Sequence, residues 1–379
     1  MGEEMDITPA GSLMEHFGDL DDPRHYNRRH LLLDIVVIAI CAVVCGADDW
    51  GAVEEFGRVR YQWLKGFLAL PHGIPSDDTF RRVFARLNAE QFQGRFITWV
   101  REVFEITKGQ VIPIDGKALR RSHDRAIGKD AIYMVSAWAT ENQLVLGQVK
   151  VDDKSNEITA IPALIDLLEL SGCIVTIDAI GCQKEIADKI IAQGANYVLA
   201  LKANQGRIYA DAQTLFEDAQ AIDFEDCDYH KTVDKGHGRI EIRECWTTAH
   251  PEYLAALYKP EQWAGLQTVA MVRAERRTAE KTETETRYFI SSLPGNAKRH
   301  LTAVRDHWHI ENRVHWILDM TFREDDCRLR KGNGAQNFAL LRHIALTLLK
   351  QERTLKRGIK NKRLRCGWDP DYLLKVLTG

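Results

Sequence analysis

Apolar positions in the first hundred residues follow the spacing that is typical of helices. They recur every three or four residues in four segments, which are 11–20, 31–46, 50–67 and 76–104. Ser76, with two acids directly after it, resembles a helix start, because its hydroxyl can accept a backbone hydrogen bond and acids favour the first turn. We therefore predict a helical N-terminal domain over residues 1–105.

The longest apolar stretch runs from Leu31 to Ala47 and contains one acid, Asp34. A helix that spans a membrane needs roughly 20 apolar residues, and this stretch is shorter. We therefore predict a buried core helix here and no association with a membrane.

The pattern changes to strands from Gln110 onward. Short runs rich in Val and Ile, including VIPID and CIVTID, predict buried strands, and the connections between them are short and polar or contain glycine. Three such strands come first, and helices then alternate with strands as far as Lys202. This order predicts an α/β fold with a mixed sheet and helices packed against it.

Strand patterns return between residues 222 and 293, and the helical spacing resumes after Asn296. We interpret the first stretch as a β-rich insertion in a central α/β domain that covers residues 106–350. The remaining residues, 351–379, are predicted to form a basic helical C-terminal tail.

The composition is that of an ordinary soluble protein, with 45% hydrophobic and 28% charged residues. Eight cysteines occur without a CxxC pair, and several lie in apolar runs, which favours buried thiols over disulfides or zinc. The acids Glu3, Glu4 and Asp6 stand where a secretory signal needs positive charge. We expect a cytoplasmic bacterial protein.

The net charge of −3 conceals a strong asymmetry. Residues 296–379 contain 18 Lys and Arg against 9 Asp and Glu. A basic region of this kind is typical of contacts with phosphates, although charge runs are often only solvated surface. The asymmetry therefore favours nucleic acid as a partner without establishing it.

Three acids form the candidate active site. Asp115 and Asp178 end two predicted strands, and Glu311 lies in a predicted helix. Carboxylates from two strands and a helix can converge on divalent cations, which prefer oxygen ligands and can activate water for phosphoryl transfer. The opposing interpretations are an Asp that caps a following helix and a Glu that is only solvated.

Six separated motifs, in order along nearly the whole chain, resemble the DDE transposases of bacterial insertion sequences, in particular the H-repeat-associated group. They are IDGK, KSNEITAIP, TIDAIGCQK, KANQG, GHGRIEIR and HWHIENRVHW. The resemblance implies a ribonuclease-H-like catalytic domain, with Asp115, Asp178 and Glu311 as both catalytic residues and metal ligands. It also implies Mg²⁺ or Mn²⁺, two ions in each site.

The resemblance further implies double-stranded DNA as partner, both the element's ends and the target, and a homodimer or higher oligomer in a synaptic complex. The chain departs from many relatives that carry Tyr, Arg and Lys around the glutamate. Its residues at those positions are Val304, His307 and Leu318. This departure leaves open how the ends are held and whether they form hairpins.

Further residues are candidates for contacts with DNA, each with an ordinary structural alternative such as a surface charge, a hairpin turn or a core aromatic. They are Lys117, Lys202, His237, Arg239, Trp246, His307, Lys356, Arg357 and Arg363. Trp308 and Trp316 are interpreted as core or interface aromatics. A zinc site on His307, Glu311 and His315 lacks the HExxH pattern or cysteines.

The leading hypothesis is a transposase that cleaves DNA at the ends of an insertion sequence and transfers the 3′-hydroxyl strand to target DNA by two-metal-ion phosphoryl transfer. Such a protein would associate with the nucleoid when bound to DNA. The alternative is an immobile, domesticated DNA-binding protein or nuclease of the same fold. A hydrolase that does not act on nucleic acid is a third hypothesis, disfavoured by the basic C-terminal quarter.

Overall fold

The computed structural model describes residues 11–26, 28–104, 106–123, 131–151, 157–236 and 238–378. Six helices come first: α1 Gly11–Phe17, α2 Leu32–Val44, α3 Trp50–Val59, α4 Tyr61–Leu64, α5 Asp77–Arg86 and α6 Ala89–Val103. A mixed region of strands and helices follows: β1 Val111–Leu119, β2 Ile132–Ala139, β3 Leu144–Lys150, α7 Glu157–Leu167, β4 Ile174–Ile177, α8 Lys184–Ala192, β5 Asn196–Leu201 and α9 Arg207–Ala221.

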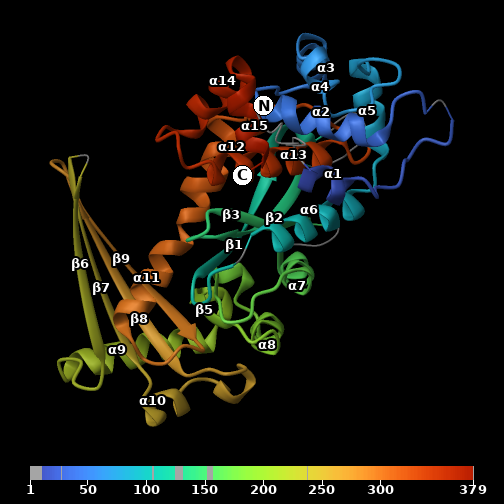
Figure 1. Cartoon of the computed structure of the whole chain (residues 1–379). Helices are drawn as coiled ribbons and strands as arrows, with labels where there is room; N and C mark the ends of the chain where they lie inside the picture. The colour runs from blue at the N-terminus through green and yellow to red at the C-terminus, as the bar shows by residue number, and fades with distance from the viewer. Residues whose placement is uncertain are drawn as a thin grey trace, which may run out of the picture.

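The second half of the chain begins with strands and ends with helices. Its elements are β6 Asp228–Gly236, β7 Arg239–Thr248, α10 Pro251–Ala255, β8 Thr268–Arg277, β9 Thr282–Ser291, α11 Ala297–His307, α12 Trp316–Met320, α13 Gly334–Gln351, α14 Ile359–Trp368 and α15 Pro370–Thr378. Figure 1 shows the N-terminal helices gathered at one end of the molecule together with α13, α14 and α15.

The predicted mixed sheet is confirmed. Nine strands form one sheet in the order β3-β2-β1-β4-β5-β9-β8-β7-β6. The pairs β1–β4 and β4–β5 are parallel, and the other pairs are antiparallel. The alternation of side chains gives the sheet two apolar faces. On one face, α11 packs against Val111, Ile174 and Val198. On the other face, the residues next to these three in their strands belong to the main core, together with residues of α7 and α8.

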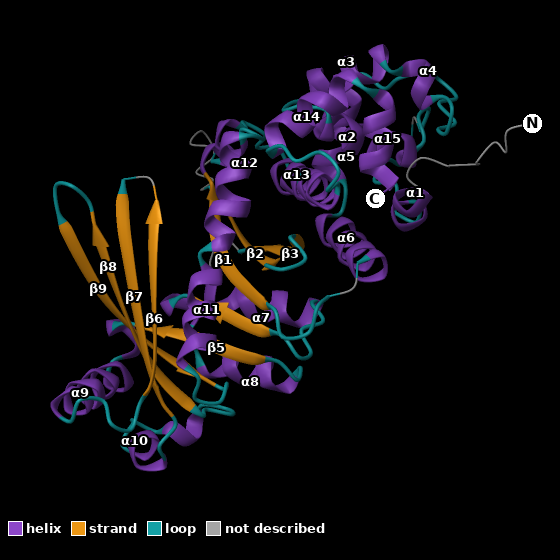
Figure 2. Ribbon diagram, turned by 60° about the vertical axis from the view of Figure 1, so that its left-hand side comes forward, coloured by secondary structure: helices purple, strands orange, loops and turns teal. Residues whose placement is uncertain are grey.

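The strands predicted as an insertion over 222–293 extend this sheet, because β9 pairs with β5 from Val198↔Ser291 to Leu201↔Tyr288. The sequence could not show this, since the pairing joins segments that lie far apart. Beyond the pairing the four strands β6 to β9 project from the rest of the sheet as an arm that lies to one side of the helical end (Figure 2). The outer half of β9 is exposed from Thr282 to Thr286, so this part of the arm has no core of its own.

The predicted core helix is also confirmed. Twelve residues of α2 are buried, and α2 packs against α13, which is buried along most of its length. A helix that is apolar on all sides is stable only when other helices enclose it. Among the described residues, none of the helices combines the length and apolar character that crossing a membrane requires.

The C-terminal residues form α14 and α15, which pack against α2 and α13. Arg363 is 5% exposed, and its guanidinium donates to the Val43 carbonyl at 2.9 Å and pairs with Asp48 at 3.2 Å. The prediction that Arg363 contacts DNA is therefore wrong in this structure. A charge of this kind is stable in the interior only because its donors are satisfied.

We expect Arg363→Gln to lower the free energy of unfolding by about 2 kcal/mol, since it leaves the buried Val43 carbonyl and the part-exposed Asp48 carboxylate without their donor. Arg357→Gln is the matched control, because Arg357 is exposed and its loss should change stability by less than about 0.5 kcal/mol. Urea denaturation followed by circular dichroism measures both. Equal midpoints for the two variants would contradict this role of Arg363.

Candidate active site

The first two carboxylates lie side by side at one edge of the parallel part of the sheet. The pairing of β1 with β4 ends at Ile114↔Ile177, and Asp115 and Asp178 are the next residues on the two strands. Asp178 directly follows β4, as predicted. Asp115 does not end its strand, because β1 continues in antiparallel pairing with β2 as far as Leu119.

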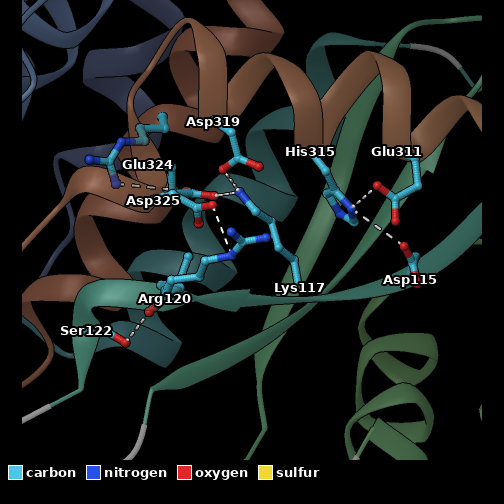
Figure 3. Close-up of polar contacts among 11 residues, drawn as sticks. Asp115, Lys117, Arg120, Ser122, Glu311, His315, Asp319, Glu324 and Asp325 are labelled. Carbon is cyan, nitrogen blue, oxygen red and sulfur yellow. Dashed lines mark hydrogen bonds and ion pairs between the residues drawn. The ribbon is translucent and has the colours of Figure 1, made fainter.

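The third carboxylate comes from the helical segment that crosses this edge. Between α11 and α12 the chain forms a π-helix from Glu311 to His315. Such wide turns are rare and occur frequently at functional sites. Figure 3 shows Glu311 and His315 pointing from this segment toward Asp115 on β1.

His315 lies between the two carboxylates and is 4% exposed. Its Nδ1 is 3.5 Å from Asp115 Oδ2 and 3.7 Å from Glu311 Oε2. These separations are longer than normal hydrogen bonds. One ligand atom from each of the three residues lies within 4.8 Å of the others, as around a shared cation. Two oxygens and an imidazole nitrogen are a donor set that Mn²⁺ or Mg²⁺ can use.

Burial and neighbouring charge change the electrostatics of this cluster. Burial raises the pKa of Asp115 to about 6, the charges of Glu311 and Asp178 contribute to the rise, and His315 opposes it. The pKa of Glu311 is lowered instead, mainly by its interaction with His315. A cation bound beside Asp115 would relieve the repulsion that its neighbouring carboxylates exert on it. Clusters with such shifts are common at functional sites.

Asp178 also has a structural role. Its Oδ1 accepts a hydrogen bond of 3.0 Å from the backbone N–H of Ile180, so it caps the short 3₁₀ turn Ala179–Gly181. The capping interpretation of this residue is thus correct and compatible with a second role. A carboxylate has lone pairs for several partners, and one such hydrogen bond leaves the others available.

A fourth carboxylate beside the site was missed by the sequence analysis. The pKa of Glu157, at the start of α7, is raised by burial and also by the charge of Asp178, against a hydrogen bond from Tyr133. Gly116 makes room for both side chains, since a Cβ there would collide with Glu157 and with the Tyr133 ring. Only the position of Glu157 in the KSNEITAIP motif hinted at a role.

Lys117 is not free to bind a phosphate, contrary to the prediction. Its ammonium donates to Asp319 and, at 2.7 Å, to Glu324 Oε2 (Figure 3). Both acids belong to segments after the π-helix, so sequence alone could not pair them with β1. Burial would lower the pKa of Lys117, but these two carboxylates outweigh it and raise the pKa. The lysine therefore links β1 to the helical segment.

A hollow of about 100 Å³ lies beside Asp178, and two predicted residues line it, Lys202 and His307. Lys202 is exposed. The Nδ1 of His307 lies 3.1 Å from Thr176 Oγ1, and burial lowers the pKa of His307 to about 4, so this imidazole is neutral at neutral pH. Trp308 also lines the hollow and is 44% exposed, so of the two alternatives predicted for it, core or interface aromatic, the core is excluded.

The remaining candidates for contacts with DNA lie away from this cluster. Trp246 is 7% exposed and stacks on Phe224, so the prediction that it contacts bases is wrong in this structure. Arg239 is part-exposed and pairs with Glu241 at 2.8 Å. Lys356 and Arg357 are exposed before α14. The prediction for His237 lies outside the described residues.

Known proteins resemble this chain along nearly its whole length. A family model described as the transposase DDE domain matches residues 106–348, and the model of a region associated with that domain matches residues 14–100. The chain is 39% identical over 372 residues to the "H repeat-associated putative transposase YhhI" of Escherichia coli K12, across 97% of this chain and 98% of the relative.

A second relative, "Putative transposase YncI" of Escherichia coli O157:H7, is 40% identical across 97% of this chain and 95% of its own. The solved structure of a piggyBac transposase synaptic complex with hairpin DNA covers all of this chain and 80% of its own, with 11% identity and a TM-score of 0.42, a likeness too distant to argue from. The domain match and the two curated relatives suffice: the chain belongs to the DDE transposase family, in its H-repeat-associated group.

Proposed function

We propose that this protein cleaves DNA at the ends of an insertion sequence and joins the 3′-hydroxyl strand to target DNA, with Asp115, Asp178 and Glu311 as its catalytic residues. The observation that carries the proposal is their convergence. Asp115 and Glu311, 196 positions apart, lie together with His315 within 4.8 Å, and Asp178 follows the strand that pairs with β1. The charges of Glu311 and Asp178 both act on Asp115, although no local interaction requires these residues to approach one another.

A ribonuclease-H-like catalytic domain is part of the proposal. The order of the first five strands supports it, since three antiparallel strands, β3, β2 and β1, continue into the parallel pair β4 and β5. Helices cover both faces, with α11 on one side and α7 and α8 on the other. Synaptic assembly of two or more copies on double-stranded DNA also belongs to this proposal.

Asp115, Glu311 and Asp178 would hold Mg²⁺ or Mn²⁺, two ions in each site, with His315 as a further ligand. Bound there, the cations would activate the attacking water or 3′-hydroxyl and stabilise charge on the leaving oxygen. Lys202, which lines the same hollow as Asp178, would bind a phosphate of the DNA backbone. His307 is neutral and hydrogen-bonded to Thr176, so it holds the helix against β4 without adding charge.

We expect Asp115→Asn, Asp178→Asn and Glu311→Gln each to reduce cleavage by roughly a thousandfold or more, because an amide is a poor ligand for Mg²⁺. The assay uses DNA that carries the sequences flanking the gene, with Mg²⁺, Mn²⁺, Ca²⁺ or EDTA. Asp166→Asn is the matched control, since Asp166 is an exposed acid on α7 that pairs only with Lys189 among the described residues.

Activity should appear with Mg²⁺ and Mn²⁺, while Ca²⁺ should support binding without cleavage. Near-normal cleavage by any one of the three variants removes that residue from the site. Sequence-specific binding by the unaltered protein with no cleavage under any condition would favour the immobile alternative, and full activity in EDTA would overturn the metal mechanism.

We expect His315→Leu to weaken Mn²⁺ binding roughly tenfold or more, since it removes a nitrogen that faces both Asp115 and Glu311. Electron paramagnetic resonance of free Mn²⁺ measures this affinity without any need for turnover. His309→Leu is the matched control, because His309 pairs with Asp306 on the same helical segment. Wild-type affinity in His315→Leu would show that the imidazole is no ligand.

A further inference from the structure

The helix that follows the active-site residues borders a second hollow, of about 570 Å³. It is lined by α12, by the end of α13 and by the segment around Arg357 to Lys362. Figure 1 shows these elements close together at the helical end of the molecule. Trp316, the first residue of α12, directly follows His315. The hollow therefore lies along the helix that directly follows the segment with Glu311 and His315.

Large apolar side chains are exposed in this hollow. Trp316 is 58% exposed and Met320 is 64% exposed, whereas Leu318 on the same helix is 1% exposed. The two exposed residues are four positions apart, so they share the outer face of α12. Adjacent exposed apolar side chains of this size commonly mark a binding surface. Of the two alternatives predicted for Trp316, core or interface aromatic, its exposure excludes the core.

The same hollow is positively charged. Lys350, Arg357 and Lys360 line it, none of its lining residues is acidic, and within the described ranges no ion pair joins these three cations to an acid. Burial lowers the pKa of Lys350 to about 8, and the charges of Arg313 and Lys362 contribute. Lys362 also lines the hollow, but it is buried and pairs with Glu352 at 3.6 Å. The Lys350 ammonium lies 5.2 Å from the centre of the Trp138 ring. Arg357 and Lys360 are thus the exposed cations of the hollow, and neither has an acidic partner among the described residues.

We propose that this hollow binds a single strand of DNA along the helix that follows Glu311 and His315, with Trp316 stacked on a base and Arg357 and Lys360 on backbone phosphates. The proposal rests on the proposed function, since it names where that substrate lies. Aromatic rings that stack bases beside cations that bind phosphates are the typical means of holding single strands. The phosphates of a DNA strand would supply the negative charge that the lining of the hollow lacks, which favours DNA as the occupant.

The test measures binding of a fluorescent oligothymidylate of about 20 nucleotides to the full chain in Ca²⁺, by anisotropy. We expect Trp316→Ala to weaken binding roughly five- to a hundredfold, since one stacked base is lost. Trp316→Phe should restore most of the affinity. Trp368→Ala is the matched control, because Trp368 is 74% exposed but lies outside the hollow, and it should bind like the wild type.

The cations are tested through salt dependence. Arg357→Gln with Lys360→Gln should flatten the slope of log affinity against log salt by roughly 0.7 for each lost phosphate contact. The control pair, Lys65→Gln with Lys375→Gln, changes exposed lysines just after α4 and on α15 and should leave the slope unchanged.

Unchanged oligothymidylate affinity in Trp316→Ala overturns the proposal, and so does an unchanged salt slope in the Arg357 and Lys360 variant. A change in sedimentation of Trp316→Ala without a change in DNA affinity would assign the hollow to contacts between copies instead. Cleavage by the wild type in Mg²⁺ distinguishes failure of this inference from failure of the proposed function. If it cleaves while Trp316→Ala binds normally, only this inference fails; if it never cleaves, the proposed function fails.

Discussion

A part-buried lysine with two acidic partners is the interaction on which the geometry of the site depends. Lys117 lies two residues after Asp115 on β1, so both side chains leave the strand on the same side. Its ammonium joins Asp319 on α12 and Glu324, which is 3% exposed (Figure 3). Breaking a buried ion pair costs several kcal/mol, because the remaining charge has no partner. β1 and α12 are therefore held in a fixed relation.

This constraint extends to the helical segment as a whole. Glu324 also lies 3.9 Å from Arg342 on α13, so the lysine is connected to the buried helix of the core. On the other side of the π-helix, α11 packs its apolar residues against the sheet. The turn that carries Glu311 and His315 is thus anchored at both ends. A π-helix costs backbone stability, and these two anchors explain how it can persist over Asp115.

The parts of the site that follow from local patterns could be predicted from sequence. Asp178 ends a run of β-branched residues, and Glu311 falls within a helical period, so both were placed correctly on their elements. The environment of Lys117 could not be predicted, because its acidic partners lie 202 and 207 residues away. In the C-terminal quarter, charge alone did not show which basic residues are available to bind DNA. Arg363 is buried against α2, while Arg357 is exposed.

Prediction of the fold from sequence has the same limit as prediction of the site. Strand periodicity predicted the mixed sheet and the β-rich stretch over 222–293, but the pairing of β9 with β5 depends on contacts between distant segments. The burial of Trp246 arises from Phe224, which precedes β6, and from this packing of strands. Local pattern thus determines the type of an element, whereas the partners of a side chain depend on how the elements pack.

The most direct test of this account is the affinity of Lys117→Gln for Mn²⁺, measured by electron paramagnetic resonance on a variant shown by circular dichroism to be folded. Removing a nearby positive charge should by itself tighten the binding of a cation. If Lys117 positions β1 against the helix that carries Glu311, the variant should instead bind Mn²⁺ several-fold more weakly, although no ligand has changed. Equal or tighter binding would contradict the account.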